Sequence, residues 1–298
     1  MSNVITSADQ LDFSLDDIPS MPLPKRVLLV RPTYYTVEHE INPHMKGQTG
    51  KVDKMQAEDQ WEILRDTYRQ MELQTEVIEG EEGLDDMVFC ANQSLPFLDA
   101  EGNKQVIMSI MKAEHRRREV PYLEQWYRRD GYEIFYLNEE KVDYYEGCGD
   151  AICHDGLRLL WGGHGFRSTL EGHRRVSELL DVPVLAVELI DDAFYHLDTC
   201  LCVLDRRTAL VYPDAFTGEG MELIETVFER VIRATSYEAR KLLACNAVCP
   251  DGRNVIIQKG CTDVNKKLRD AGYQVHEVDT SEYLKSGGSV FCMKQMVW

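Results

Sequence analysis

Cys292 and His196 are the residues whose type and surroundings best suit nucleophilic chemistry. Cys292 follows the paired glycines Gly287-Gly288 near the C-terminus, and His196 lies well upstream with Asp198 two positions after it. A thiolate is a strong nucleophile, and an imidazole nearby can take up or deliver its proton. The pair points to a covalent cysteine enzyme. A buried structural cysteine in a final strand is the alternative for Cys292 taken alone.

Other polar residues stand where predicted strands end or turns begin. Taken singly, each could be a turn residue, a helix cap, a solvated charge or a satisfied core residue. In chain order they are Asn42, Asp86, Asn92, Arg116, Glu146, Arg167 and Asp198. Carboxylates, amides and guanidinium groups bind small polar ligands through charge-assisted hydrogen bonds. The order of these residues along the chain is stronger evidence for a functional site than any one of them alone.

Composition limits the partners. The chain has 298 residues, 44% of them hydrophobic, and a formal net charge of -18. Nucleic acid and anionic lipid surfaces both demand basic protein surfaces, so neither is an expected partner. A local carboxylate cluster can still bind a small cation. We therefore expect a small-molecule substrate, no nucleic acid and no membrane, and we allow a homo-oligomer.

The cysteines indicate a reducing environment. There are nine, an odd number, and the first residues carry no basic or long apolar stretch typical of a secretory signal. These features predict a cytoplasmic protein with free thiols. Cys245 and Cys249 have no matching pair at zinc-site spacing, so no metal is predicted. No dinucleotide or phosphate-binding glycine motif is present, so no cofactor is predicted.

Strands and helices alternate along the chain, which favours an α/β fold. Residues 1–24 are predicted to be an acidic, flexible tail, and residues 25–298 a single catalytic domain without an internal linker. Helical periodicity predicts helices at 54–72, around 123–127, 172–180, 219–233 and 262–271. Short apolar runs predict strands at 26–30, 87–90, 105–108, 132–137, 157–161, 182–187, 199–204, 209–212, 254–258 and 273–278.

From about Arg26 onward the sequence resembles the guanidino-group-modifying enzymes, or pentein superfamily, and within it the arginine dihydrolases of the cyanobacterial type. The segments that carry the resemblance are Ile41–Pro43, Asp86–Asn92, Glu146–Asp150, Gly165–Ser168, Phe194–Cys200, Ala244–Asn246 and Gly287-Gly288 before Cys292. The resemblance implies a five-fold pseudo-symmetric α/β propeller of ββαβ modules, with the active site in its central channel.

The resemblance also implies roles for the polar residues. Cys292 would attack the guanidinium carbon, and His196 would protonate the departing ammonia and then activate water. Glu146 and Asp198 would bind the guanidinium. Arg116 and Arg167 would bind the substrate's α-carboxylate, and Asn42 would help there; Asp86 and Asn92 would complete the substrate site.

Two positions bear on the substrate and the product. Asp198 favours an unsubstituted guanidinium over a methylated one, because an anion there suits a group rich in N–H donors. Asn92 stands where the resemblance implies aspartate in arginine deiminases and asparagine in dihydrolases. A neutral amide should let a citrulline-like intermediate react again, giving ornithine, ammonia and carbon dioxide.

Phe291 departs from the family pattern, and we expect it to crowd the thiol and reshape the pocket.

Other functions stay open. An arginine deiminase would stop at citrulline, an amidinotransferase would need a second amine, and a dimethylarginine hydrolase would accept a methylated substrate. A non-catalytic arginine-binding protein or a metalloenzyme belongs to a different class. Product analysis, binding without ammonia release, and elemental analysis distinguish these functions.

Overall fold

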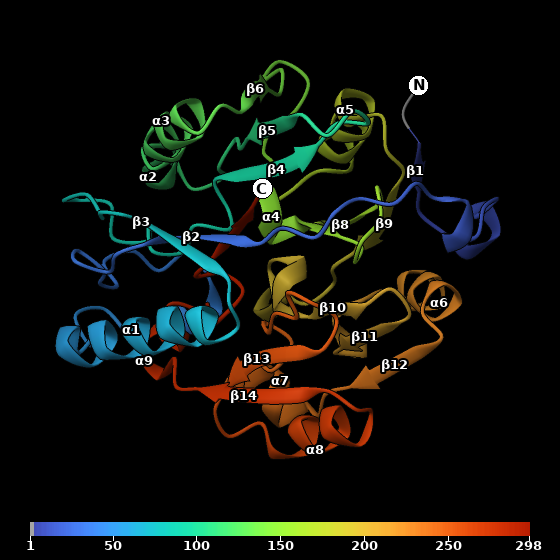
Figure 1. Ribbon diagram of the computed structural model, residues 1–298. Coiled ribbons are helices and arrows are strands. Elements are labelled where there is room, and N and C mark those ends of the chain that lie inside the picture. Colours follow the sequence, from blue (N-terminus) through green and yellow to red (C-terminus); the bar gives the residue numbers. More distant parts are fainter. Residues whose placement is uncertain (1–2) are drawn as a thin grey trace.

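The computed structural model describes residues 3–298, and five small sheets lie around a common centre with the longer helices outside them (Figure 1). The sheets are β1-β9-β8-β7, β10-β11-β12, β13-β14, β15-β2-β3 and β4-β5-β6. The strands are β1 (Val4–Ile5), β2 (Arg26–Val30), β3 (Gln74–Ile78), β4 (Ser94–Leu98), β5 (Lys104–Met108), β6 (Glu133–Tyr136), β7 (Ala151–Cys153), β8 (Leu160–His164), β9 (Val184–Glu188), β10 (Leu201–Asp205), β11 (Thr208–Val211), β12 (Arg230–Arg233), β13 (Asn254–Gln258), β14 (Gln274–Val278) and β15 (Gln295–Val297).

One pairing pattern recurs in the sheets. β5 pairs antiparallel with β4 and parallel with β6, and the same holds for β11 with β10 and β12. β8 pairs in this way with β7 and β9, and β2 with β15 and β3. In the remaining sheet β13 is parallel to β14, and an antiparallel bridge joins Val248 to Ile256. Parallel neighbours need a crossover, which a helix supplies in each case.

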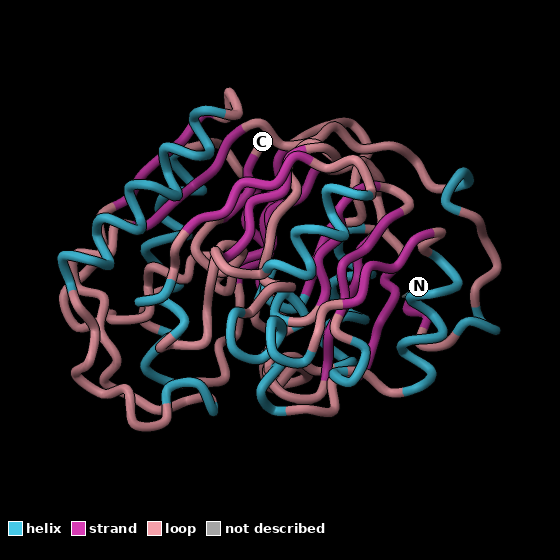
Figure 2. Tube along the Cα trace, turned by 90° about the horizontal axis from the view of Figure 1, so that it is seen from below, coloured by secondary structure: helices cyan, strands magenta, loops and turns pink. Residues whose placement is uncertain are grey.

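The helices are α1 (Lys54–Gln70), α2 (Glu114–Arg117), α3 (Val120–Arg129), α4 (Gly147–Asp150), α5 (Leu170–Leu180), α6 (Gly218–Val227), α7 (Ser236–Leu242), α8 (Thr262–Asp270) and α9 (Ser281–Leu284). The sequence sets α1 locally, because the Asp53 carboxylate accepts from the backbone of Met55 and Gln56 at its N-terminus. Trp61 and Leu64 then fall on the buried face at helical spacing. In the perpendicular view the helices flank the strands (Figure 2).

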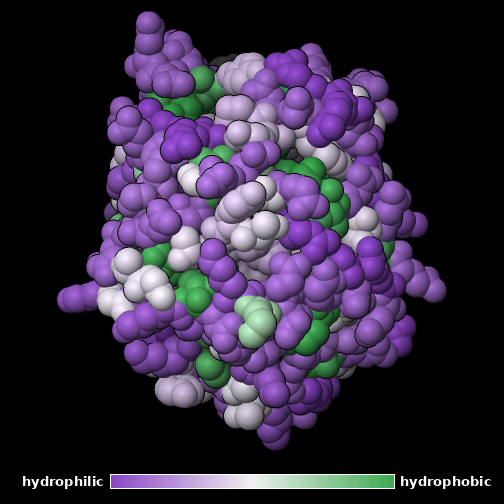
Figure 3. All heavy atoms as spheres, turned by 90° about the vertical axis from the view of Figure 1, so that its left-hand side faces the viewer, coloured by the Kyte–Doolittle hydropathy of each residue, from purple (hydrophilic) through white to green (hydrophobic). Residues whose placement is uncertain are grey.

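The surface agrees with the strong net charge. On the face shown in Figure 3 hydrophilic residues dominate, and apolar residues form small separate patches. Among the described residues, no helix combines the length and hydropathy needed to cross a bilayer.

The N-terminal segment packs on the body of the protein from Asn3 onward. Val4–Ile5 pair with β9, Ser20 bridges Leu157, and Met21 is buried. Residues 1–2 of the predicted tail lie outside the described residues. The flexibility of residues 1–24 stays a prediction, although the segment contributes to the packing.

The predicted α/β alternation is confirmed, with specific errors in the elements. The helix predicted at 219–233 ends at Val227, and β12 (Arg230–Arg233) follows it, because the β-branched pair Val231-Ile232 pairs with β11. The strand predicted at 87–90 is a series of turns, and the strand here is β4 instead. β4 was not predicted because it contains Pro96, and proline disfavours a strand interior. Proline is tolerated there because β4 is at the edge of its sheet.

Candidate active site

Cys292 lies in a turn just before β15, fully enclosed and 2% exposed. Its Sγ donates to Asp198 Oδ2 at 3.1 Å and accepts from Asn246 Nδ2 at 3.1 Å. Burial, and next the negative charge of Asp198, raise the pKa of the Cys292 thiol well above its usual range. In the unliganded site the predicted nucleophile is therefore a thiol, and a positive charge beside Asp198 would favour its ionisation.

Asn246 fixes the position of this thiol. Its Oδ1 accepts from the backbone N–H groups of Ser289 and Cys292, which leaves Nδ2 to donate to the sulfur and to the Asp198 carbonyl. Two backbone donors on one side thus determine which end of the amide faces Cys292. The asparagine was quoted in the family pattern but given no role. It lies in the turns between α7 and β13, and its presence in the quoted segment Ala244–Asn246 is the sequence signal that could have identified it.

Asp198 has one acceptor atom free. Its Oδ2 accepts from the thiol, while Oδ1 is buried without a hydrogen-bond partner among the described residues. Burial raises the pKa of the Asp198 carboxyl to about 7, and the Cys292 hydrogen bond opposes that rise. A ligand with N–H donors and positive charge would satisfy Oδ1 and stabilise the ionised form.

His196 and Glu146 form a direct pair. Nε2 of His196 lies 2.7 Å from Glu146 Oε2, and Nδ1 is buried without a partner among the described residues. Glu146 also accepts from Arg167 Nη1 at 3.2 Å and from the backbone N–H of Lys112. Burial alone would raise the pKa of Glu146, but the charge of Arg167 and the His196 hydrogen bond outweigh it and lower the pKa to about 2. Glu146 thus orients the imidazole through one nitrogen and leaves the other available.

Arg116 sets the orientation of Asn92. Arg116 Nη1 donates to Asn92 Oδ1 at 2.9 Å, and the rest of the guanidinium is bound to Glu119 and to the carbonyls of Asp86 and Phe89. The amide of Asn92 therefore turns its Nδ2 inward, where it is buried without a partner in the described part of the chain. Gly149 makes room, since a Cβ there would lie 2.4 Å from this nitrogen and 3.3 Å from the His196 ring.

The pocket above the thiol is small. It is lined by Asn42, Asp86, Asn92, Arg116, Arg167 and Cys292 among others, and its free volume is about 10 Å³. Both oxygens of the buried Asp86 carboxylate lack hydrogen-bond partners among residues 3–298. Asn42 holds the covering loop instead of pointing a free amide inward, because it donates to the Ser286 carbonyl and caps residues 43–45. Ligand entry thus requires this loop to move or the arginines to exchange partners.

All nine predicted site residues lie in or beside this pocket. Six of them line it, and Asp198 adjoins it through its hydrogen bond with Cys292. Glu146 and His196 form a hydrogen-bonded pair next to Arg167, which donates to Glu146. The expectation for Phe291 is wrong. Phe291 does not line the pocket but faces the opposite side with Lys294, in a second cavity that also contains Cys148, Cys153, Cys202 and Cys249. We call this the thiol-lined cavity.

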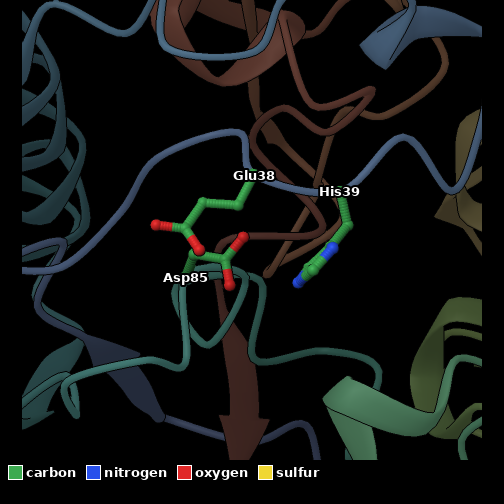
Figure 4. A group of neighbouring side chains, drawn as sticks. All are labelled: Glu38, His39 and Asp85. Carbon is green, nitrogen blue, oxygen red and sulfur yellow. The ribbon is translucent and has the colours of Figure 1, made fainter.

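A further polar group lies near the pocket. Glu38 and His39 lie on the loop after β2, and Asp85 lies in the turns before β4 (Figure 4). The three side chains come close together, with their potential metal-binding atoms within 4.8 Å of one another. The His39 ring also packs on His115, which is 3.6 Å from Asp86. Glu38 and His39 are exposed, and these three side chains alone do not define a metal site.

Asp150 and Glu119 are two further buried carboxylates, to which the sequence analysis gave no role. Asp150 Oδ1 accepts from the backbone N–H of Leu197 beside His196, and burial raises its pKa to about 7. Glu119 holds Arg116, and burial raises the pKa of Glu119 to about 7 against the opposing charge of that arginine. Each carboxylate holds a residue of the predicted site or its neighbour and does not line the pocket itself. Residue type alone therefore did not indicate this role.

The known proteins to which this chain is similar are named for the hydrolysis of arginine or dimethylarginine. A family model described as eukaryotic N,N dimethylarginine dimethylhydrolase matches residues 31–297. The bifunctional arginine dihydrolase/ornithine cyclodeaminase AgrE of Nostoc sp. is 35% identical over 269 residues, which are 90% of this chain and 37% of AgrE. The chain therefore spans little more than a third of that relative's length.

Two further relatives match over most of their length. The N(G),N(G)-dimethylarginine dimethylaminohydrolase of Mycobacterium tuberculosis is 35% identical over 91% of this chain and 85% of its own. The N-terminal domain of the cyanobacterial arginine dihydrolase ArgZ, a cysteine-to-serine mutant bound to its substrate, superposes with a TM-score of 0.85. It is 33% identical, over 91% of this chain and 97% of that domain.

Proposed function

The chain belongs to the dimethylarginine dimethylhydrolase family, and from that premise we propose that it hydrolyses the guanidino group of arginine to give ornithine, two ammonia and carbon dioxide. It would do so through a covalent adduct on Cys292. Relatives of both kinds, arginine dihydrolases and dimethylarginine hydrolases, support guanidino hydrolysis. The choice between them rests on the residues of this chain.

In the proposed reaction the substrate itself helps to activate the nucleophile. A guanidinium beside Asp198 Oδ1 would offset the negative charge that raises the pKa of Cys292, so the thiol would ionise when substrate is bound. The thiolate would then attack the central carbon. His196, oriented by Glu146, would deliver a proton to the departing ammonia and afterwards take one from water.

The orientation of Asn92 is the observation that most favours a dihydrolase. Because Arg116 occupies its Oδ1, Asn92 offers the pocket an N–H donor and no acceptor. A guanidinium has only donors, whereas the ureido oxygen of citrulline is an acceptor. The site would therefore retain the citrulline formed in the first half of the reaction, and a second hydrolysis would give ornithine.

Product analysis tests this proposal. Purified enzyme given arginine should release ornithine and two equivalents of ammonia, and citrulline given alone should also be converted. The Asn92→Asp variant should shift the product toward citrulline, because its carboxylate prefers the cationic guanidinium. Accumulation of stoichiometric citrulline by the wild type would support an arginine deiminase instead.

A dimethylarginine hydrolase is the second candidate, supported by the family model and the mycobacterial relative. Asp198 favours the unsubstituted substrate, because each methyl group replaces an N–H donor that its carboxylate could accept. Comparing kcat/KM for arginine and asymmetric dimethylarginine decides between the two. Faster release of dimethylamine than of ammonia would assign the methylated substrate.

The remaining expectations stay proposals. We propose that residues 25–298 form one catalytic domain and that the five sheets are the modules of a pseudo-symmetric propeller. The recurring antiparallel and parallel pairing supports that architecture. A cytoplasmic location and a homo-oligomer are likewise proposed; size determination by light scattering tests the second.

A further inference from the structure

The thiol-lined cavity lies across the C-terminal segment from the predicted active site. Its volume is about 110 Å³, and it shares no lining residue with the pocket above Cys292. Met21, Leu23 and other apolar side chains form most of its wall. At the rim the Trp298 indole N–H donates to the Pro22 carbonyl at 2.7 Å, which ties the C-terminal segment to the N-terminal one.

Lys294 is the unusual residue of this cavity. Its side chain is 2% exposed, and its Nζ has no hydrogen-bond acceptor and no carboxylate within 4.0 Å among residues 3–298. The nitrogen lies 3.2 Å from the centroid of the Phe291 ring, on the cavity wall. A ring face stabilises an ammonium only partly, and a buried cation without an anion or acceptor is costly.

No carboxylate among residues 3–298 forms an ion pair with this lysine, although the negative charge of Asp198, near Cys292, acts on it from beyond ion-pair distance. The four cysteines of the cavity are free thiols, and burial raises the pKa of each above its usual value. Asp155 also lines the cavity but lies beyond ion-pair distance of Lys294. Burial lowers the pKa of Lys294, as expected for an ammonium that lacks a partner.

We propose that the thiol-lined cavity binds a small organic carboxylate, whose charge pairs with Lys294 Nζ while its apolar end packs against the wall. A cation would be repelled by Lys294, and a neutral molecule could accept a hydrogen bond from Nζ but would not balance its charge. A cavity of roughly 150 Å³ holds a benzene-sized molecule, so this one suits a carboxylate of a few heavy atoms. The site is separate from the proposed site for the substrate's α-carboxylate, which involves Arg167 on the other side of Cys292.

Fluorine NMR with trifluoroacetate as the probe tests this site, with trifluoroacetamide as the neutral control of similar shape. The acid should bind the wild-type protein and the amide should not. Lys294→Met should weaken binding of the acid about tenfold or more, because a charge-assisted contact is lost. Arg167→Met should leave it unchanged, since that variant alters only the active-site pocket.

A second variant separates binding from folding. Leu23 is 37% exposed at the rim, so Leu23→Trp should narrow the opening and weaken binding without disturbing the core. Equal binding of acid and amide, or no binding of the acid at millimolar concentration, would overturn the proposal. So would binding that is lost in Arg167→Met and kept in Lys294→Met, because the carboxylate would then occupy the active site.

Discussion

The two sides of the segment Phe291–Lys294 differ in how their polar groups are satisfied. On the side of Cys292, the arginines are held by carboxylates and amides, while Asp86, Asn92, Asp198 and His196 each keep a buried polar atom without a hydrogen-bond partner among the described residues. On the side of Lys294, the lining is mostly thiols and apolar side chains with a few polar groups such as Asp155, and no acceptor among residues 3–298 binds the ammonium. The first arrangement is typical of a preorganised catalytic site, and the second of a site that a simple anion would complete.

The largest expected difference between the two sides comes from a matched pair of cysteine variants. Cys292→Ser should abolish turnover of arginine, because a hydroxyl would need far stronger activation than this site supplies. Cys202→Ser, in the thiol-lined cavity, should leave kcat/KM close to wild type. Steady-state ammonia release measures both. If the two variants lost activity equally, Cys292 would have no special role.

Gly149→Ala should be nearly as damaging. The new Cβ would lie 2.4 Å from Asn92 Nδ2 and press on His196, so both side chains would have to move. Displacements of about 1 Å in an active site can cost about a hundredfold in rate, and we expect at least that loss in kcat. Gly218→Ala, where the new Cβ meets nothing within 4 Å, is the control and should retain full activity.

Asn246→Ala should have a moderate effect. The variant removes the amide that donates to Cys292 Sγ and holds the backbone of Ser289 and Cys292. Loss of contacts of this kind corresponds to roughly a tenfold to hundredfold fall in kcat. Alkylation of Cys292 should also become less specific relative to the other thiols, as mass spectrometry of labelled peptides can measure. An unchanged kcat would show that the thiol is positioned by other means.

How far the sequence predicts this site depends on what each residue does. Cys292 and His196 were selected because their types suit nucleophilic chemistry, and the resemblance to a known family then gave Asp198 its predicted role. Asn246, Asp150 and Glu119 were not selected, since they act by holding another side chain, and such a role appears only when distant segments meet. Phe291 shows the same limit, because the side of the chain on which it lies depends on the turn before β15.

In the fold, too, the elements set by local sequence were predicted, whereas those that depend on distant partners were not. Amphipathic α1 and the apolar strand β2 follow from local periodicity and were predicted well. β4 and β15 were missed because their strand character comes from their partners. β4 carries a proline, and β15 is three residues long and pairs with β2 from the other end of the chain.

The smallest and most specific contrast concerns stability against pH. Asp198 has a pKa raised to about 7 from 3.8, so the folded state binds a proton that the unfolded state has lost between these values. Its ionisation therefore costs stability progressively as pH rises through this interval, and the full cost is present above about pH 7. Lys294 has a lowered pKa, so the folded state disfavours its charged form, and that cost is present at low pH and fades as pH rises toward 10.5.

Asp198→Asn should thus raise Tm at pH 8 and leave it almost unchanged at pH 4, while it impairs arginine turnover. Lys294→Met should raise Tm at pH 5 and raise it less at pH 9. For a protein of this size each kcal/mol corresponds to roughly 2–4 °C, so differential scanning fluorimetry across pH resolves both changes. The opposite slopes are the decisive feature, because general loosening or tightening of the core would shift both variants in the same direction at every pH. Parallel slopes would mean that the two buried groups do not carry the opposite costs that their surroundings imply.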